Sequence, residues 1–214
     1  MVKDIHVGNG DGEVIFQDVF KTIENDDRII LSRVEPFHTL VDGITVPKSG
    51  KLEISGDGNY GIKVSTGMTV YGELTLKNLT LDFSLTDERA GERIFVEGGK
   101  LNLKNVTIIG SKHTGSPIMV HNGTLNMTRT SAVKGAERSY AVELKNKSKA
   151  TLQHCDIDGF VMTDSDIMLY DVKVRHGAFV KENSSMVSDL VTYDFYQADD
   201  PRNLYVSDSK VILN

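Results

Sequence analysis

Apolar and polar residues alternate along most of this chain, and the alternation is interrupted at a recurring place. The stretches GELTLKNLTLDF (72–83) and GKLNLKNVTIIG (99–110) both carry two apolar residues two apart, a step of three, and two further apolar residues. Alternation with a period of two predicts a strand that buries one face. The step of three predicts a sharp corner at Asn78 and Asn105, because asparagine tolerates the left-handed backbone that such a corner requires.

The same pattern recurs in weaker form towards the C-terminus. Its copies open on small residues, namely Gly50, Gly72, Gly99, Gly123, Ser148, Ser165, Ser184 and Ser209. A further short strand is expected to close each copy, as in Ile94–Glu97, Ile118–His121, Ala141–Leu144, Ala178–Lys181 and Leu204–Ser207. Three short strands in roughly 24 residues predict one coil of a parallel β-solenoid, in which each coil pairs only with its neighbours.

The N-terminal segment follows a different pattern. Phe16, Val19, Phe20 and Ile23 are spaced as one face of a short helix. Because a solenoid end exposes unpaired strand edges, we expect this helix to act as a cap. The predicted organisation is a cap segment over residues 1–27 and an all-β solenoid of about eight coils over residues 28–214.

Three phrases near the N-terminus resemble the entry of the pectin-lyase-like superfamily. They are Gly10-Asp11-Gly12, Val19-Phe20-Lys21-Thr22-Ile23 and Asp27-Arg28-Ile29-Ile30-Leu31, and the asparagine corner is similar to the asparagine ladder of that family. The resemblance implies a single-stranded right-handed parallel β-helix with three short sheets and a short N-terminal capping helix. It also implies that a functional site lies on the outer face of the closing strands. It does not fix the function, because this fold hosts lyases, hydrolases and inert scaffolds.

The outward positions of the closing strands fall into two columns. The first column contains Phe95, Met119, Glu143, Val161, Phe179 and Tyr205. The second contains Glu97, His121, Lys145, Thr163, Lys181 and Ser207. The first column is partly apolar, and an exposed apolar stripe is typical of an interaction surface.

Carboxylates suitable for catalysis are sparse in these columns. A glycoside hydrolase needs two carboxylates that act together, and the columns offer Glu97 and Glu143, about 10 Å apart if two coils separate them. A lyase of the resembling family implies a calcium site, so calcium enters only with that alternative. The weak catalytic candidates are Glu97, Glu143, His121 and Lys181. The histidines have no metal-ligand spacing, and no metal site is predicted.

A second charged patch is expected on the strands that follow the asparagine corner. It contains Asp156, Asp158, Lys173, Arg175 and Asp194. Opposite charges on adjacent strands support strand pairing, which favours a surface ion ladder. The alternative is a site that combines a carboxylate with a cation, built from Asp156, Asp158 and Arg175.

Composition narrows the range of partners. The net charge is −6 and the chain has no block of basic residues, which argues against nucleic acid. No apolar run has the length of a membrane span. The single cysteine, Cys155, is predicted to fill the core. The compartment stays open between cytoplasmic and exported with a removed leader, and an apparently uncapped C-terminal end makes an oligomer possible.

These observations favour a non-catalytic β-helix that binds or scaffolds. It would present the apolar positions Phe95, Met119, Val161, Phe179 and Tyr205 to an extended polysaccharide or a partner protein. Two alternatives stay open. One is a small polysaccharide-active enzyme, either a lyase or a hydrolase, and the other is a segment of a phage-tail or cell-surface fibre.

Overall fold

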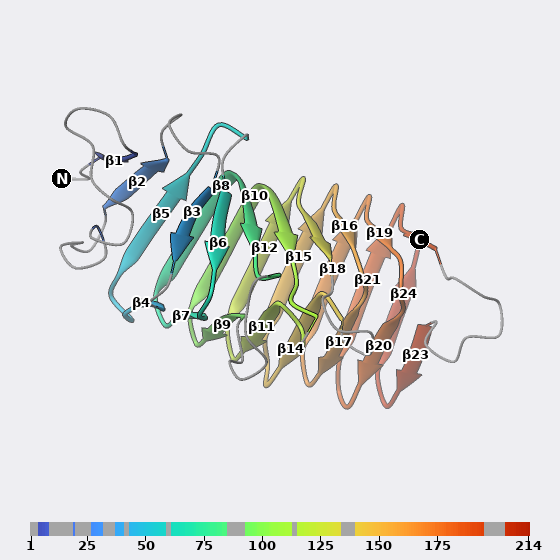
Figure 1. Cartoon of the computed structure of the whole chain (residues 1–214). Coiled ribbons are helices and arrows are strands. Elements are labelled where there is room, and N and C mark those ends of the chain that lie inside the picture. Colours follow the sequence, from blue (N-terminus) through green and yellow to red (C-terminus); the bar gives the residue numbers. More distant parts are fainter. Residues whose placement is uncertain are drawn as a thin grey trace.

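The chain winds into a right-handed parallel β-helix, seen in a computed structural model. The structure describes residues 4–8, 19, 27–31, 37–40, 43–58, 61–84, 93–112, 115–133, 140–194 and 204–214. Successive coils lie side by side from the N-terminal to the C-terminal end (Figure 1). The predicted all-β solenoid is therefore confirmed, and with it the architecture that the family resemblance implied.

One sheet, here called sheet A, carries the strands that open each copy of the repeat. In spatial order these are β1 (Asp4–Val7), β2 (Arg28–Leu31), β5 (Lys51–Ser55), β8 (Glu73–Asp82), β10 (Lys100–Ile109), β12 (Thr124–Thr128), β15 (Lys149–Gln153), β18 (Asp166–Tyr170), β21 (Ser185–Asp189) and β24 (Lys210–Leu213). A third face joins the same sheet, because β8 and β10 continue around the asparagine corner without a break.

The third face consists of the ends of β8 and β10 together with short strands beyond the corner. The short strands are β3 (Phe37–Leu40), β6 (Gly61–Val64), β13 (Ser131–Val133), β16 (Asp156–Ile157), β19 (Lys173–Val174) and β22 (Thr192–Tyr193). The three predicted faces are thus present, but two of them form one hydrogen-bonded sheet of 16 strands.

The closing strands form a separate sheet, here called sheet B. Its members are β4 (Ile44–Val46), β7 (Met68–Val70), β9 (Ile94–Glu97), β11 (Ile118–His121), β14 (Val142–Lys145), β17 (Phe160–Thr163), β20 (Ala178–Lys181) and β23 (Leu204–Ser207). The predicted strand bounds hold, except that β14 lies one residue later than Ala141–Leu144. Sheet B runs along the lower side of the rod in Figure 1.

The corner between sheet A and the third face has the left-handed backbone that the asparagines predicted. Six successive coils place a residue with φ between 49° and 55° there: Asn78, Asn105, Arg129, His154, Asp171 and Leu190. Asn105 Nδ2 donates to Asn78 Oδ1 at 3.1 Å, so the first two corners are also joined by their side chains. The corner geometry therefore continues through coils whose sequences depart from asparagine.

Small residues open the strands of sheet A because neighbouring coils approach closely there. A Cβ on Gly99 would lie 2.6 Å from the carbonyl oxygens of Gly72 and Val70, which is closer than real side chains approach backbone. In later coils the equivalent residues are buried serines that bond to backbone, as Ser148 Oγ does to Val120 O at 3.0 Å. Both solutions keep the coils in register.

The interior is a continuous apolar column. Leu74, Leu76, Leu101 and Leu103 are fully buried, as the alternation predicts. Cys155 is 4 % exposed and belongs to this core, which confirms its predicted place. Burial raises the pKa of the Cys155 thiol, although backbone hydrogen bonds partly oppose this effect.

The expected capping helix falls mostly outside the described residues. Phe16, Phe20 and Ile23 are not among them, whereas Val19 is described, is helical and is fully buried. The division into a cap over 1–27 and a solenoid over 28–214 stays a prediction. In the described part of the chain, no helix is long and apolar enough to cross a membrane.

Candidate binding site on sheet B

The outer face of sheet B presents two columns of side chains, one residue from each strand in each column. The register aligns Phe95, Met119, Glu143, Val161, Phe179 and Tyr205 in the first column. It aligns Glu97, His121, Lys145, Thr163, Lys181 and Ser207 in the second. Each strand contributes alternate residues to the core, as in Val96 and Val180. The residues before and after them in the strand therefore point outward.

The N-terminal part of this face is a network of paired polar groups. His121 Nδ1 lies 2.8 Å from Glu97 Oε2, and its Nε2 contacts the Asn146 side chain. One strand further on, Lys145 Nζ lies 2.6 Å from Glu143 Oε1. The ring of Phe95 lies 6.3 Å from that of His121. The polar groups of this part therefore already have partners within the protein.

The C-terminal part of the face is a cluster of aromatic rings. Phe179 and Tyr205 are stacked, with centroids 5.7 Å apart and planes 28° from parallel. The ring of Tyr140 also packs against that of Phe179, with centroids 5.3 Å apart. Lys181 Nζ lies 5.4 Å from the Phe179 centroid and 5.9 Å from that of Tyr205, within the range of a cation–π contact. Tyr205 is 48 % exposed. We call these four residues the aromatic cluster.

A shallow pocket of about 320 Å³ lies at the opposite end of the first column. Gly67, Met68, Thr69, Arg93, Phe95 and Met119 line it. The Arg93 guanidinium is half-buried and donates to the Met119 sulfur at 3.7 Å, which is a weak interaction. The guanidinium of Arg93 thus lies in the lining of this pocket, beside Met119.

The four weak catalytic candidates do not come together. Glu97 and His121 are in contact, but Glu143 pairs with Lys145 and Lys181 lies over the aromatic cluster. Strand β11 separates the strands that carry Glu97 and Glu143. Over the described ranges, no group of three or more His, Cys, Asp or Glu residues is arranged to hold a metal ion. The geometry therefore offers one His–Glu pair rather than a set of cooperating carboxylates.

The second charged patch lies on the third face, and its charges are paired with one another. Arg175 contacts the Asp156 carboxylate, which raises the pKa of the guanidinium. Lys173 Nζ lies 3.0 Å from Asp194 Oδ2. Asp158 differs from the expected outward position, because it is buried at 6 % exposure and lies 3.6 Å from His176. Asp158 follows directly after β16, so the alternation within that strand does not set its exposure.

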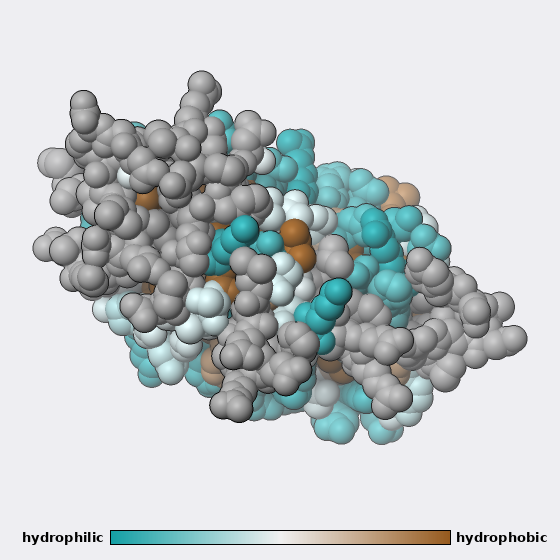
Figure 2. All heavy atoms as spheres, in the orientation of Figure 1, coloured by the Kyte–Doolittle hydropathy of each residue, from teal (hydrophilic) through white to brown (hydrophobic). Residues whose placement is uncertain are grey.

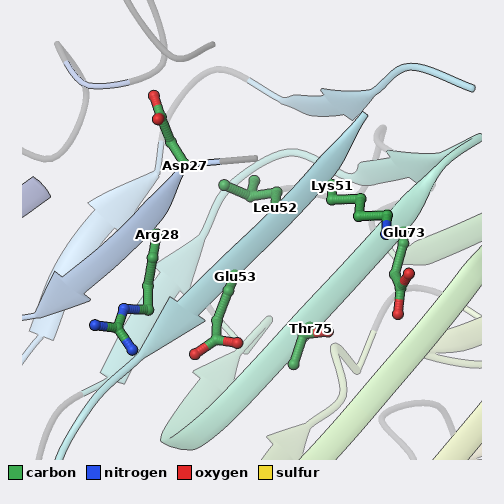
Figure 3. Close-up of a pocket in the computed structure, with 7 residues that line it drawn as sticks. All are labelled: Asp27, Arg28, Lys51, Leu52, Glu53, Glu73 and Thr75. Atoms are coloured by element: carbon green, nitrogen blue, oxygen red, sulfur yellow. The ribbon is translucent and has the colours of Figure 1, made fainter. Parts of the chain in front are cut away.

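A larger hollow of about 510 Å³ lies on the outer face of sheet A near the N-terminal end. Figure 3 shows the side chains of Arg28, Glu53 and Thr75 extending from the neighbouring strands β2, β5 and β8. Arg28 makes two bonds to Asp4, at 2.8 and 2.5 Å, and the Glu53 carboxylate lies 2.6 Å from Lys77 Nζ. These pairs satisfy the main charges of the hollow, so it is a weaker candidate than sheet B.

Three residues of the sheet B site were missed by sequence reasoning. Tyr140, Arg93 and Asn146 lie just before or just after a closing strand, outside the alternating columns. An aromatic or cationic residue directly beside a predicted strand is the signal that could have found the first two. The contact between Asn146 and His121 depends on how one coil is placed over the next.

The fold and this site define a class of protein, namely a parallel β-helix in which the outer face of sheet B is elongated and partly aromatic. A search of solved structures finds a mutant of AlyGC, a PL6 family alginate lyase, with 13% sequence identity and a TM-score of 0.44. The match covers 98% of this chain and 40% of that one. No family model matches the sequence, and neither does a curated protein. At this level of similarity, the AlyGC match assigns neither an activity nor a site.

Proposed function

We propose that this protein is a non-catalytic binding module whose sheet B face holds an extended carbohydrate polymer. The aromatic cluster carries the proposal, because it offers stacked rings and a cation on the outside of two adjacent strands. The C–H face of a sugar ring is apolar and packs on aromatic rings, whereas its hydroxyl rim bonds to polar groups. Lys181 lies where it can donate to such a rim while remaining over the rings.

The shape of the face supports an extended ligand rather than a small one. The six strands that carry the first column are about 4.8 Å apart, so this column runs for roughly 24 Å. The aromatic cluster lies at one end of this column and the Arg93 pocket at the other. Glu143 and Val161 lie between them in register, and Val161 offers apolar contact on the way. A linear chain of sugars could contact both ends at once.

The pairing of the carboxylates supports a binding role without catalysis. Glu97 and Glu143 each contact a cationic or ring partner at 2.8 Å or less. A general acid must hold a proton near the scissile bond, and it needs a second carboxylate or a base in reach. Among the described residues, no second carboxylate is in contact with the His121–Glu97 pair, and this arrangement favours the binding role.

A polysaccharide screen with two readouts tests the proposal. The full chain is applied to an array of neutral and anionic polysaccharides, and each ligand that binds is also incubated with the protein, with and without calcium, while chain length is followed. We expect retention of at least one polymer without shortening. Depolymerisation would overturn the non-catalytic part, and a folded protein that binds no polymer would overturn the binding part.

A further inference from the structure

The outer face of sheet A changes its chemistry along the rod. From β5 onwards, its central column is polar over five strands and apolar over the last three. In order, the column contains Glu53, Thr75, Asn102, Asn126 and Thr151, followed by Met168, Val187 and Ile212. The strand register thus places three apolar side chains in contact range of one another on an outward face.

These apolar residues are substantially exposed. Met168 is 55 % exposed and Ile212 38 %, while Val187 between them is half-buried. Leu190 extends the exposed area at the corner, with 63 % exposure and a positive φ of 55°. Exposed and half-buried apolar residues that lie close together are typical of a surface that another molecule covers.

We propose that this apolar column is the contact surface of a symmetric dimer, so that its occupant is a second copy of this chain. The surface can pair with a second copy of itself. In an isologous interface, each residue faces a residue of the same surface on the second copy. A two-fold axis that runs along the column places Met168, Val187 and Ile212 against the same residues of the second copy.

The flanking residues fit this two-fold arrangement as well. On β18, Asp166 would face the hydroxyl of Tyr170 in the second copy, because these residues lie at equal distances on either side of Met168. By the same geometry, Ser185 would face Asp189, and Lys210 would face Asn214. Each of these pairs combines a donor with an acceptor. The other possible two-fold axis, along β21, would bring Asp189 against Asp189, and this repulsion favours the first arrangement.

The size of the surface sets the expected affinity. Three strands of five residues cover roughly 15 by 16 Å, or about 250 Å² on each copy. Stable complexes bury about 1,200 Å² or more in total. The dimer is therefore expected to be weak and to form only at high protein concentration. This proposal concerns sheet A and is independent of the binding role of sheet B.

Sedimentation of the full chain over a wide range of concentration tests the dimer. We expect reversible association that Val187→Glu abolishes, because it would place two carboxylates on the axis. Thr163→Glu is the matched control, since it introduces the same side chain on the outer face of sheet B, away from the proposed axis. A monomer at every concentration, or a dimer that Val187→Glu leaves unchanged, would overturn the proposal. Thermal unfolding of both variants establishes that they fold.

Cross-linking tests which surfaces meet. A short bis-maleimide should join two copies of Met168→Cys, because the axis along the column places residue 168 against the same residue of the second copy. Thr163→Cys, on the outer face of sheet B, is the control and should stay monomeric. The native Cys155 is buried and should not compete. Equal cross-linking of both variants, or cross-linking of Thr163→Cys alone, would contradict the arrangement.

Discussion

The two halves of the rod use different small residues where one coil approaches the next. Up to Gly123 the coils open on glycine, and from Ser148 they open on serine. The surfaces change in the same region. Of the exposed large apolar residues in the described ranges, all except Tyr71 lie between Met168 and Leu213. In the view of Figure 2, the coloured surface is mainly hydrophilic, with hydrophobic residues in small separate areas.

The two halves differ in the contacts that hold their coils together and in the side chains that they expose. In the N-terminal half, close backbone contacts and asparagine corners hold the coils, and outward groups pair with one another. In the C-terminal half, serine hydroxyls hold the coils, and the outward positions carry the aromatic cluster on sheet B and the apolar column on sheet A. The aromatic cluster and the apolar column thus lie in the half whose coils open on serine.

The largest expected effect is a glycine substitution in the N-terminal half. Gly99→Ala would place a methyl group 2.6 Å from two backbone oxygens that belong to the neighbouring coil and cannot move separately. We expect a loss of about 3 kcal/mol of folding free energy, measured by denaturant unfolding. Gly115→Ala is the control, because its Cβ would meet only the end of Arg93, at 3.8 Å. Equal effects of the two variants would refute the packing argument.

A serine substitution in the C-terminal half should cost less. Ser148→Ala removes a buried hydroxyl that donates to backbone oxygens at 2.5 to 3.0 Å and accepts from Gly123 N at 3.4 Å. The expected loss is about 1–2 kcal/mol, again measured by unfolding. Thr151→Ala, at an outward position of the same strand, should change stability by less than about 0.5 kcal/mol. If Ser148→Ala were as harmless, its hydrogen bonds would not hold the coil.

The corner of the C-terminal half offers a stabilising change. Leu190 has a φ of 55°, in the region that favours glycine, and its side chain is largely exposed. Leu190→Gly should therefore raise the unfolding free energy by up to about 1 kcal/mol. At Asn105, whose side chain bonds to Asn78, the same substitution should not stabilise. Stabilisation by glycine at both corners would show that the Asn105–Asn78 hydrogen bond does not contribute to stability.

The smallest expected effect is on alkaline stability. Burial raises the pKa of Tyr193 above its ordinary value of 10.0, while the nearby Ser188 acts in the opposite direction to a smaller extent. The unfolded chain therefore loses this proton first as the pH rises, so the folded state is destabilised from about pH 10 through the higher folded pKa. Tyr193→Phe should flatten this part of the stability profile. If the unfolding free energy of Tyr193→Phe fell with pH as steeply as that of the native protein between about pH 9 and 11, titration of Tyr193 would be excluded as the cause.

Sequence patterns could predict the rod because its forces are local and repeated. The alternation around Leu74 and Leu101 fixes which side of each strand is buried, and the step at Asn78 fixes the corner. Leu190 adopts the same left-handed backbone without a favourable side chain, because stacking on the preceding corners imposes it. Sequence alone could not show this, since the propensity of leucine argues against it.

The site was less predictable because it depends on contacts between coils of irregular length. The columns of sheet B followed from alternation, but the Tyr140–Phe179 contact depends on the path that leads into β14. Asp158 was expected outside with Asp156, yet it lies beyond the end of β16, beside His176, and is buried. The segments between strands have no period, and the position of a side chain within them is set by the neighbouring coils.

Affinity for a polysaccharide identified by the screen tests the central claim most directly, when two variants of sheet B are compared. Phe179→Ala removes the middle ring of the aromatic cluster, whereas His121→Ala removes a paired group of the N-terminal part. By calorimetric titration, we predict a loss of roughly tenfold or more for Phe179→Ala. His121→Ala should stay within about twofold of the native protein. Equal affinities of Phe179→Ala and the native protein, or a larger loss for His121→Ala, would contradict the account.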